Sequence, residues 1–531
     1  ATYKPILKIV QLDKNGMANL NGKTLNGEAE EEDRIEKSFS GQVLFISGGS
    51  GFLGKVLVEK LLRSCPSLKK IYLLIRDKKG KSAHERMQDI FKNELFDTLK
   101  KQRGEEEVLK QVQAICGDVT LPGLGLSEES RRILSEEVNI IYHCAATVRF
   151  DIPLRQATLT NTRGTKYMLD LAKQCKKLIF FGYVSTAYCH LNTDVLLEKP
   201  YDPPADPEKI IKLCELLDDE GMASIEKKIL GAYPNTYSFT KALAEDLVVK
   251  TFDTLPSMIL RPSIVIPIWK EPLPGWTDNI NGPTGLLIGA GKGVIRSMYC
   301  DSTGYGDYLP VDMAVNGIIL ATWYTVHFGS LPQRVCHMTS SQEIQVTWQE
   351  IIEIGRWVIE NKVPLNGAAW YPGGSMKKSR FLHELCVILF HWIPAILVDI
   401  LLFCLGYPPV LCRVQKRITN GFKMFEYYTN RNWKFDLTEG YRVRSLMNER
   451  ERKKYIIEKK DLDLYDYFEQ CTLCTRRYIL KTPDHMIPAA KRHLKILWVI
   501  DRLCKGLFLF WVGYYIYTRF IYRFLFDATS V

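Results

Sequence analysis

The stretch Gln42-Val-Leu-Phe-Ile-Ser-Gly-Gly-Ser-Gly-Phe-Leu-Gly54 decides the fold class of this chain. An apolar run leads directly into three glycines at intervals of three, Gly48, Gly51 and Gly54. This pattern predicts a buried first strand, a tight turn and a helix over Lys55–Leu62. Such a turn lets backbone N–H groups approach a diphosphate, which then faces the positive end of the helix. We therefore expect a dinucleotide-binding fold.

The chain up to about residue 370 alternates between short apolar runs and segments of helical length. The apolar runs lie at 42–46, 71–75, 112–116, 140–142, 178–181 and 258–260. Short buried strands that alternate with helices predict an α/β fold with a doubly wound parallel sheet, the Rossmann arrangement. We assign residues 39–370 to this domain, which also holds a smaller substrate-binding part. The polar residues 1–38, with an acidic cluster near their end, predict a mobile leader.

Composition limits the partners that the chain can have. Its 531 residues are 46% hydrophobic and carry a net charge of +11, which reflects either a solvated surface or attraction to anionic cofactors, coenzyme A or lipid headgroups. We find no zinc-finger, homeodomain or RNA-binding signature, so nucleic acid is not an expected partner. The 14 cysteines lack the spacing of a disulfide framework and predict free thiols. The single C-x-x-C pair, Cys471 and Cys474, has no second pair or histidine cluster, and we expect no metal.

The character of the sequence changes after about residue 370. We expect a mainly helical domain over 371–500 and a hydrophobic tail over 501–531. The uncharged run Leu385–Val398 and its continuation to 412 are interpreted either as a buried core helix or as a membrane segment. The uncharged run Gly506–Thr518 is rich in aromatic residues and flanked by basic ones, which suits a lipid headgroup region. We predict membrane association through the C-terminal region, by a tail that spans the bilayer or lies at its surface.

The second predicted strand indicates which nicotinamide cofactor is used. NAD-binding folds carry an acidic residue at the end of this strand, where it binds the ribose hydroxyls. Here the strand ends in Arg76, whose guanidinium suits a 2′-phosphate, so we expect NADPH, although the adjacent Asp77 leaves NADH as an alternative. Asp118 ends the next strand and is expected near the adenine, and small residues from Ala145 onward are expected beside a ribose. The cofactor residues predicted in this way are Gly48, Ser50, Gly51, Phe52, Leu53, Gly54, Arg76, Asp118, Val119, Ala145, Ala146 and Thr147.

Two further motifs predict the chemistry. Tyr237 and Lys241 are four residues apart, which places them one turn from each other on the same face of a helix. A neighbouring ammonium stabilises a phenolate, so we expect the pKa of Tyr237 to be lowered from about 10, in preparation for proton transfer near neutral pH. Thr186 and Ser185 follow a predicted strand, and the hydroxyl of either one can stabilise the oxygen on which charge develops. These residues predict a Thr/Ser–Tyr–Lys reductase site, in which Tyr237 and Lys241 also contact the cofactor.

Several further motifs make the chain resemble the alcohol-forming fatty acyl-CoA reductases, and the insect members most, within the extended short-chain dehydrogenase/reductases. The resemblance covers about residues 38–340 and resumes more loosely in the C-terminal part. It adds Pro262 and Ile264 to the expected cofactor site. The chain departs from the family at two places. Ser47 replaces the threonine that is common before the glycines, and the tryptophan that the family usually shows near its final conserved tyrosine is not clearly present. The motifs are Arg149-Phe-Asp151, Asn161-Thr-Arg-Gly-Thr165, Leu260-Arg-Pro-Ser-Ile-Val265, Glu271-Pro-Leu-Pro-Gly-Trp276, Gly282-Pro-Thr-Gly285, Leu309-Pro-Val-Asp-Met313, Trp433-Lys-Phe-Asp436 and Lys460-Asp-Leu-Asp-Leu-Tyr-Asp-Tyr467.

The resemblance implies a reaction in which two NADPH reduce a long-chain fatty acyl-CoA to a fatty alcohol through a bound aldehyde, with release of coenzyme A. In that reaction Thr186 or Ser185 and Tyr237 stabilise and protonate the substrate oxygen, and Lys241 holds the ribose. We expect an intracellular membrane location, at the endoplasmic reticulum or alternatively the peroxisome, with the catalytic domain in the cytosol. The alternatives are a membrane-associated hydroxysteroid or sterol dehydrogenase, a nucleotide-sugar epimerase and a catalytically silent NADPH-binding scaffold. Acyl chain length and oligomeric state are not predicted.

Overall fold

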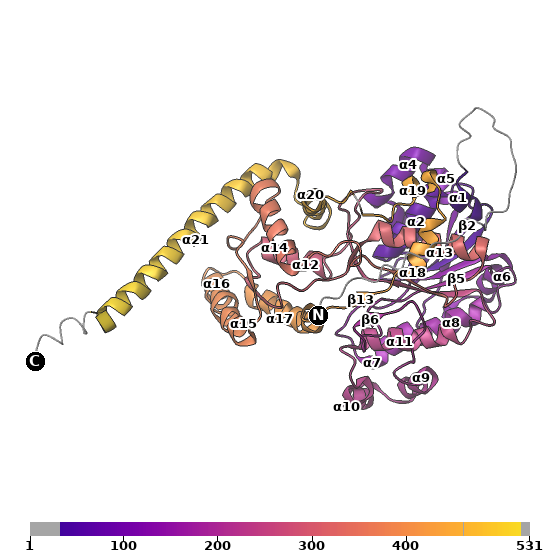
Figure 1. Cartoon of the computed structure of the whole chain (residues 1–531), viewed down its shortest axis with the longest axis horizontal. Coiled ribbons are helices and arrows are strands. Elements are labelled where there is room, and N and C mark those ends of the chain that lie inside the picture. Colours follow the sequence, from indigo (N-terminus) through magenta and orange to yellow (C-terminus); the bar gives the residue numbers. More distant parts are fainter. Residues whose placement is uncertain (1–31, 460, 522–531) are drawn as a thin grey trace, which may run out of the picture. The chain divides into compact units, whose positions relative to one another are not determined.

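The computed structural model describes residues 32–459 and 461–521, and the part from Asp33 onward is one compact unit (Figure 1). In this unit a seven-stranded sheet has the strand order β11-β7-β5-β4-β1-β2-β3. All neighbouring strands in it are parallel, and β1 lies between β2 and β4, so the predicted doubly wound Rossmann sheet is confirmed. The strands are β1 (Val43–Ser47), β2 (Lys70–Ile75), β3 (Val112–Cys116), β4 (Ile140–His143), β5 (Phe180–Val184), β7 (Ser257–Pro262) and β11 (Val335–Met338).

Strand β11 is not among the strands that the sequence predicts. Its four residues are Val-Cys-His-Met, and the polar His337 interrupts what would otherwise be an apolar run. All four are nevertheless buried, because β11 pairs with β7 at the edge of the sheet and His337 finds hydrogen-bond partners there. A buried polar residue with satisfied hydrogen bonds therefore hides a strand from a search for apolar runs.

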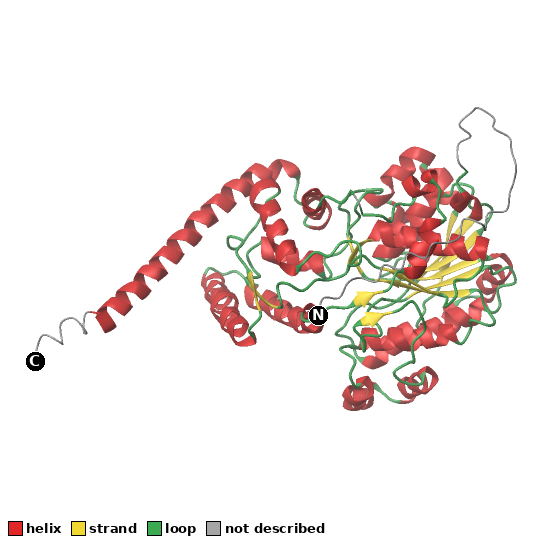
Figure 2. Cartoon of the chain, in the orientation of Figure 1, coloured by secondary structure: helices red, strands yellow, loops and turns green. Residues whose placement is uncertain are grey.

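Helices cover both faces of the sheet (Figure 2). On one face α2 (Phe52–Ser64) packs against α13 (Val311–Phe328), and their apolar side chains share a buried cluster with Leu44 and Ile46 of β1. On the other face α8 (Arg163–Ala172) and α11 (Thr236–Val249) share a cluster with Phe45. Successive side chains of β1 thus point to opposite faces of the sheet, as they do in any β-strand. The other helices up to residue 370 are α3 (Ala83–Phe91), α4 (Asp97–Arg103), α5 (Glu105–Lys110), α6 (Glu128–Glu137), α7 (Leu154–Ala157), α9 (Pro207–Leu216), α10 (Asp219–Leu230), α12 (Pro283–Gly291) and α14 (Trp348–Trp357).

The described part of the chain after residue 370 is mainly helical, as predicted, and short parallel strand pairs join it to the Rossmann domain. In these pairs β13 (Lys434–Phe435) lies beside β6 (Val195–Leu196), and β12 (Ser375–Lys377) lies beside β9 (Ser297–Tyr299). A third pair, β8 (Ile264–Ile266) with β10 (Tyr308–Pro310), lies within the first 370 residues. The C-terminal helices are α15 (Arg380–Val387), α16 (Ile393–Cys404), α17 (Leu411–Thr429), α18 (Thr438–Ser445), α19 (Glu449–Lys454), α20 (Leu464–Cys474) and α21 (Ile487–Ile516).

One helix in the described residues is long and apolar enough to cross a membrane. It spans the 25 residues Arg380–Cys404 and consists of α15, a π-helical turn at Ile388–Trp392 and α16. Its most apolar 18-residue window has a mean hydropathy of 2.4. Only 22% of its most apolar window is buried, which contradicts the alternative of a buried core helix for this segment. The C-terminal half of α21 enters the predicted tail and exposes large apolar side chains such as Phe510 and Trp511. Residues 522–531 of that tail lie outside the described residues.

The predicted leader differs from the structure at its C-terminal end. Helix α1 (Arg34–Ser38) falls within the predicted 1–38, yet its Ile35 is fully buried, as is Phe39 directly after it. Arg34 Nη2 donates to Glu451 Oε2 at 2.7 Å, so a residue of α19 holds the helix in place. The prediction of mobility is therefore wrong for 34–38, because two apolar side chains in a polar stretch are enough to anchor one helical turn. Residues 1–31 lie outside the described residues.

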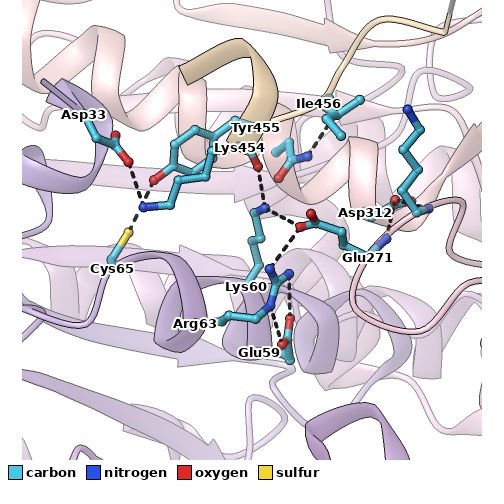
Figure 3. Close-up of polar contacts among 12 residues, drawn as sticks. Asp33, Glu59, Lys60, Arg63, Cys65, Glu271, Asp312, Lys454, Tyr455 and Ile456 are labelled. Carbon is cyan, nitrogen blue, oxygen red and sulfur yellow. Dashed lines mark hydrogen bonds and ion pairs between the residues drawn. The ribbon is translucent and has the colours of Figure 1, made fainter. Parts of the chain in front are cut away.

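A polar network joins segments that are far apart in the sequence (Figure 3). Lys60 of α2 is buried, and its Nζ donates to the carbonyl oxygen of Lys454 at 2.7 Å and to Glu271 Oε2 at 3.1 Å. Arg63 Nη1 donates to the same Glu271 oxygen at 2.9 Å. Lys454 Nζ in turn donates to Asp33 Oδ2 at 2.7 Å. The network therefore holds the N-terminal helices, the loop around Glu271 and the end of α19 together.

We expect Lys60→Met to lower the stability of the protein by about 2 kcal/mol, because a buried carbonyl and a carboxylate lose a charged donor while the apolar stem is kept. The loss is measured as a lower midpoint of urea unfolding. The matched control is Lys92→Met, since the Lys92 side chain is 71% exposed and its change should leave the midpoint in place. Equal midpoints for the two variants would contradict a stabilising role for the network.

Candidate active site

The glycine turn brings strand β1 and helix α2 so close together that side chains are excluded. A Cβ added at Gly54 would lie 2.2 Å from the carbonyl oxygen of Gly48, and one at Gly48 would lie 2.6 Å from the backbone nitrogen of Ala145. Gly48 also has a φ of +75°, which favours glycine. Helix α2 starts after Gly51 without a capping side chain and without an acidic residue in its first turn. The N–H groups of that turn are therefore suited to an anion such as a diphosphate.

A buried hydrogen-bond chain fixes the ends of β1 and β4 beside this turn. Ser47 Oγ lies 2.6 Å from His143 Nδ1 and accepts from the Ala145 N–H at 3.3 Å. His143 Nε2 lies 3.1 Å from Thr165 Oγ1, which donates to the carbonyl oxygen of Asn161. Burial lowers the pKa of His143 to about 3, so its ring is neutral, donating through Nε2 and accepting from the Ser47 hydroxyl at Nδ1. The hydroxyl of Ser47 thus performs this task without the extra methyl group of a threonine.

Arg76 and Asp77, which follow β2, have separate roles. The Asp77 carboxylate accepts from the backbone N–H of Ala83 at 2.7 Å and so faces the start of α3. The Arg76 side chain is 55% exposed, and its Nη1 lies 3.3 Å from Asp118 Oδ2. Burial raises the pKa of Asp118, but hydrogen bonds from Thr120 and the guanidinium of Arg76 outweigh burial and hold it below its usual value. The Arg76 guanidinium is thus exposed beside Asp118 at the carboxyl edge of the sheet, whereas the Asp77 carboxylate is engaged by the Ala83 N–H and lies close to Cys116 at the end of β3.

The structure brings Thr186 and Tyr237 together. Tyr237 lies in the first turn of α11, and Thr186 follows β5. The Thr186 hydroxyl lies near enough to Tyr237 to act on the pKa of the phenol, whereas Ser185 Oγ lies 3.7 Å from the sulfur of Cys189. Of the two hydroxyls that the sequence leaves open, Thr186 is the one in contact with the tyrosine.

Lys241 lies one turn after Tyr237 and is buried. Its Nζ donates to the carbonyl oxygen of Val184 at 2.6 Å and lies 4.5 Å from the centre of the Tyr183 ring. Burial lowers the pKa of Lys241 to about 8. Burial also raises the pKa of Tyr237, and the hydrogen bond from Thr186 only partly opposes this. The expected lowering of the Tyr237 pKa is therefore wrong, since desolvation outweighs the other effects.

A buried ion-pair cluster continues along the same face of α11. Glu245 accepts hydrogen bonds from Arg261 Nε at 2.9 Å and Arg261 Nη2 at 2.7 Å, and from His190 Nε2 at 2.8 Å. Cys189 Sγ lies 3.2 Å from the same carboxylate. Cys189, His190 and Glu245 are close enough to share a metal ion, but the guanidinium of Arg261 already neutralises the carboxylate. The geometry is that of an ion-pair cluster.

Aromatic residues from both parts of the chain surround Tyr237, and the sequence does not point to them. The ring of Phe150 stacks on that of Tyr237, with 5.6 Å between the ring centres, and the centre of the Tyr428 ring in α17 lies 5.6 Å from that of Phe150. The Tyr428 hydroxyl accepts from Asn235 Nδ2 at 2.8 Å and lies 2.9 Å from Ser238 Oγ. Phe150 belongs to the motif Arg149-Phe-Asp151, to which the sequence assigns no role. Tyr428 lies 190 residues after Ser238 of α11, so no local sequence pattern connects the two.

An apolar cavity of about 170 Å³ lies between α12, α14 and α20. It begins at Ile266 and Pro267, just after the predicted cofactor residue Ile264. Lys459 also lines it, and within the described residues its buried Nζ has no hydrogen-bond partner. The other lining residues are mostly apolar and include Leu286, Leu287, Met298, Ile351, Leu365 and Phe468.

The remaining predicted residues gather at one edge of the sheet. Val119 follows β3, Pro262 ends β7, and Thr147 exchanges two hydrogen bonds with Asn161. Ser50, Phe52 and Leu53 belong to the glycine turn and the first turn of α2. Since the carboxyl ends of parallel strands meet at this edge, the positions fit a bound dinucleotide. Their individual contacts with a cofactor stay predictions.

Two family models, both described as Male sterility protein, match the chain: an NAD-binding one over residues 46–318 and a second over 390–482. The chain is 36% identical to fatty acyl-CoA reductase 1 of Mus musculus over 463 residues, which cover 87% of this chain and 89% of that protein. It is 33% identical to fatty acyl-CoA reductase wat of Drosophila melanogaster over 487 residues, covering 91% of this chain and 93% of that protein.

Solved structures with the same fold are reductase domains of modular synthetases. The terminal R domain of the myxalamid PKS-NRPS pathway aligns with a TM-score of 0.56 at 19% identity, over 83% of this chain and 92% of that one. The R domain of a Mycobacterium tuberculosis non-ribosomal peptide synthetase aligns with a TM-score of 0.54 at 18% identity, over 85% of this chain and 96% of that one. At such identities the likeness shows the fold alone.

The lowered pKa of Lys241 predicts a pH-dependent affinity for the cofactor. Below about pH 8 the side chain is an ammonium that can donate to a ribose hydroxyl, and above this pH the charge is lost. We expect NADPH affinity, measured by fluorescence titration from pH 6.5 to 9.5, to fall as the pH rises through about 8.

Lys241→Met should bind NADPH more weakly and without this inflection, while Tyr237→Phe should keep the inflection. If Lys241→Met retained it, another group would be responsible, such as Glu198, whose pKa is raised by burial to about 8.

Proposed function

This chain belongs to the fatty acyl-CoA reductase family, and on that premise we propose that it reduces long-chain fatty acyl-CoA to fatty alcohol with NADPH, releasing coenzyme A. The observation that carries the proposal is the placement of Thr186 beside Tyr237, with Lys241 one turn away, at the edge of the sheet that also holds the glycine turn. The apolar cavity between α12, α14 and α20 supports an acyl substrate, since its lining has few polar groups.

A reduced nicotinamide cofactor, when bound, would supply one hydride for the thioester carbonyl carbon and, after exchange for a second reduced cofactor, one for the aldehyde. Between the two reductions the C–S bond would break and coenzyme A would leave as the thiol. We assign the proton on the substrate oxygen to Tyr237, whose raised pKa keeps the phenol protonated at physiological pH. Thr186 orients this hydroxyl and offers a second hydrogen bond to the oxygen. Lys241, still largely charged at pH 7, is assigned to the ribose.

Arg76 supports NADPH over NADH. Its guanidinium is exposed where the 2′ position of the adenine ribose is expected, and the acidic neighbour Asp77 faces α3 instead. A planar guanidinium suits the bidentate binding of a phosphate. We therefore infer NADPH as the cofactor.

The exposed apolar helices support a location at an intracellular membrane, where long-chain substrates are found. We propose the endoplasmic reticulum, with the peroxisome as the alternative, and a catalytic domain that faces the cytosol. The composition of α21, apolar and aromatic with basic residues nearby, is consistent with this proposal.

Turnover of palmitoyl-CoA with NADPH by the full chain in detergent tests the reaction. We expect fatty alcohol and two NADPH consumed for each thiol released. Tyr237→Phe should lower kcat at least about 100-fold, because the proton donor is lost. Tyr465→Phe is the matched control, since Tyr465 is 47% exposed and outside the site. NADPH binding without any thiol release, for several chain lengths, would contradict the acyl-CoA assignment.

Arg76→Ala tests the cofactor preference. Removal of a charged hydrogen-bond donor to a phosphate should raise KM for NADPH at least about tenfold, with much less change for NADH. Lys92→Ala serves as a control for the lost positive charge. If KM rose equally for both cofactors, Arg76 would not be the residue that distinguishes them.

A further inference from the structure

The helix Arg380–Cys404 has an inverted distribution of polarity. Its buried residues recur at every fourth position and are mostly polar: His383, Val387, His391, Ala395 and Asp399. The outer surface carries large apolar side chains, with Phe381 76% exposed and Phe403 74% exposed. The other exposed apolar residues of this helix are Leu382, Leu385, Ile388, Leu389, Phe390, Ile393, Ile396, Leu397, Val398, Ile400 and Leu401. A helix on a water-soluble protein shows the opposite pattern.

Specific hydrogen bonds hold the polar stripe against the protein. His383 Nδ1 lies 2.9 Å from Ser297 Oγ, and His391 Nε2 accepts from the backbone N–H of Arg296 at 2.9 Å. Asp399 accepts from three backbone N–H groups at the start of α17, at 2.8–2.9 Å. The inversion is therefore built into the fold, because each buried polar side chain has a defined partner.

The extent of the apolar surface favours lipid as the occupant. Exposed apolar residues occur at consecutive positions, such as 388–390 and 396–398, and so surround most of the helix and not one stripe. A second protein surface covers one flank of a helix, whereas acyl chains surround all sides that the protein leaves open. A second copy of this chain is therefore the poorer match.

Basic residues lie on both sides of this apolar surface. Lys378 precedes the helix and Arg380 begins it, and their side chains, 83% and 66% exposed, form ion pairs with Asp301 and Glu426. After the turn that contains Pro408 and Pro409, α17 exposes Arg413, Lys416 and Arg417. Such positions suit the headgroups of anionic phospholipids.

Both ends of the segment are tied to the same strand, which decides how it lies in a membrane. Upstream, β12 pairs with β9, and downstream Asn430, directly after α17, donates to the carbonyl oxygen of Tyr299 in β9. The midpoint, His391, is also bonded to Ser297 of β9. A helix fixed along its length to one side of the protein cannot cross the bilayer without breaking these bonds.

We propose that the apolar surface of residues 381–410 lies in one leaflet of a bilayer that contains anionic phospholipid, as a contact separate from the tail helix α21. The proposal extends the membrane association in the proposed function. It also places lipid next to the cavity, since Ser297 of β9 contacts the helix and lines that cavity. A long-chain substrate then enters the cavity from the leaflet.

Photo-crosslinking tests the contact without measuring turnover, so its failure leaves the reductase assignment in place. The full chain is added to sealed phosphatidylcholine/phosphatidylserine vesicles that contain a diazirine-labelled phosphatidylcholine, and crosslinked peptides are identified by mass spectrometry. We expect adducts within 381–405 as well as in α21. Adducts in α21 alone, or adducts in neither helix, would overturn the proposal.

A double variant tests the residues that carry the contact. Leu397→Glu with Leu401→Glu, at positions 62% and 57% exposed, should lower the adducts in 381–405 at least about tenfold, because carboxylates are costly among acyl chains. Leu216→Glu is the matched control, at a position 83% exposed on α9. An unchanged adduct yield in the double variant would contradict the proposal, and circular dichroism and NADPH binding verify that both variants are folded.

A third measurement distinguishes one leaflet from a crossing. Tyr407, 63% exposed in the turn after α16, is changed to cysteine in the full chain, and an impermeant maleimide is enclosed in the vesicles before the protein is added outside. We expect no modification of Tyr407→Cys from the inside. Modification there would show that the helix crosses and would overturn the one-leaflet arrangement.

Discussion

The close approach of β1 and α2 at Gly48 and Gly54 is the constraint on which the rest of this structure depends. With no room for a Cβ at either position, the strand passes directly into a helix whose first N–H groups face outward. Strand β1 lies inside the sheet, with β2 and β4 on either side. Arg76, Ala145 and Thr186 follow β2, β4 and β5 at the carboxyl edge of the sheet, where the glycine turn after β1 also lies.

Burial has a different consequence at each ionisable group of this site. It lowers the pKa of Lys241 and of His143, and it raises that of Tyr237. The result is a neutral histidine that serves only to position the backbone, a lysine that loses its charge near pH 8, and a tyrosine that stays protonated. A tyrosine that stays protonated can donate a proton, which is the role that we propose for Tyr237.

The same rule of burial operates in reverse in the C-terminal part. In the Rossmann sheet apolar side chains lie inside, and β1 alternates them between two faces. Along Arg380–Cys404 the polar stripe packs against the rest of the protein, and the large apolar side chains are exposed. Strand β9 contacts both the helix and the cavity. The backbone N–H of Ser297 donates to His391, and Met298 lines the cavity. The apolar cavity and the exposed apolar helix thus meet at β9.

The sequence by itself determined the parallel sheet, the glycine turn and the Tyr237–Lys241 pair, because each depends on neighbours in the chain or on a short periodicity. Only the tertiary structure decided that Thr186 and not Ser185 contacts Tyr237, that Asp77 faces α3, and that Phe150 and Tyr428 surround the tyrosine. It also revealed β11 and helix α1, whose polar residues conceal their burial. These features depend on contacts between distant segments and on desolvation, and neither is encoded in local sequence patterns.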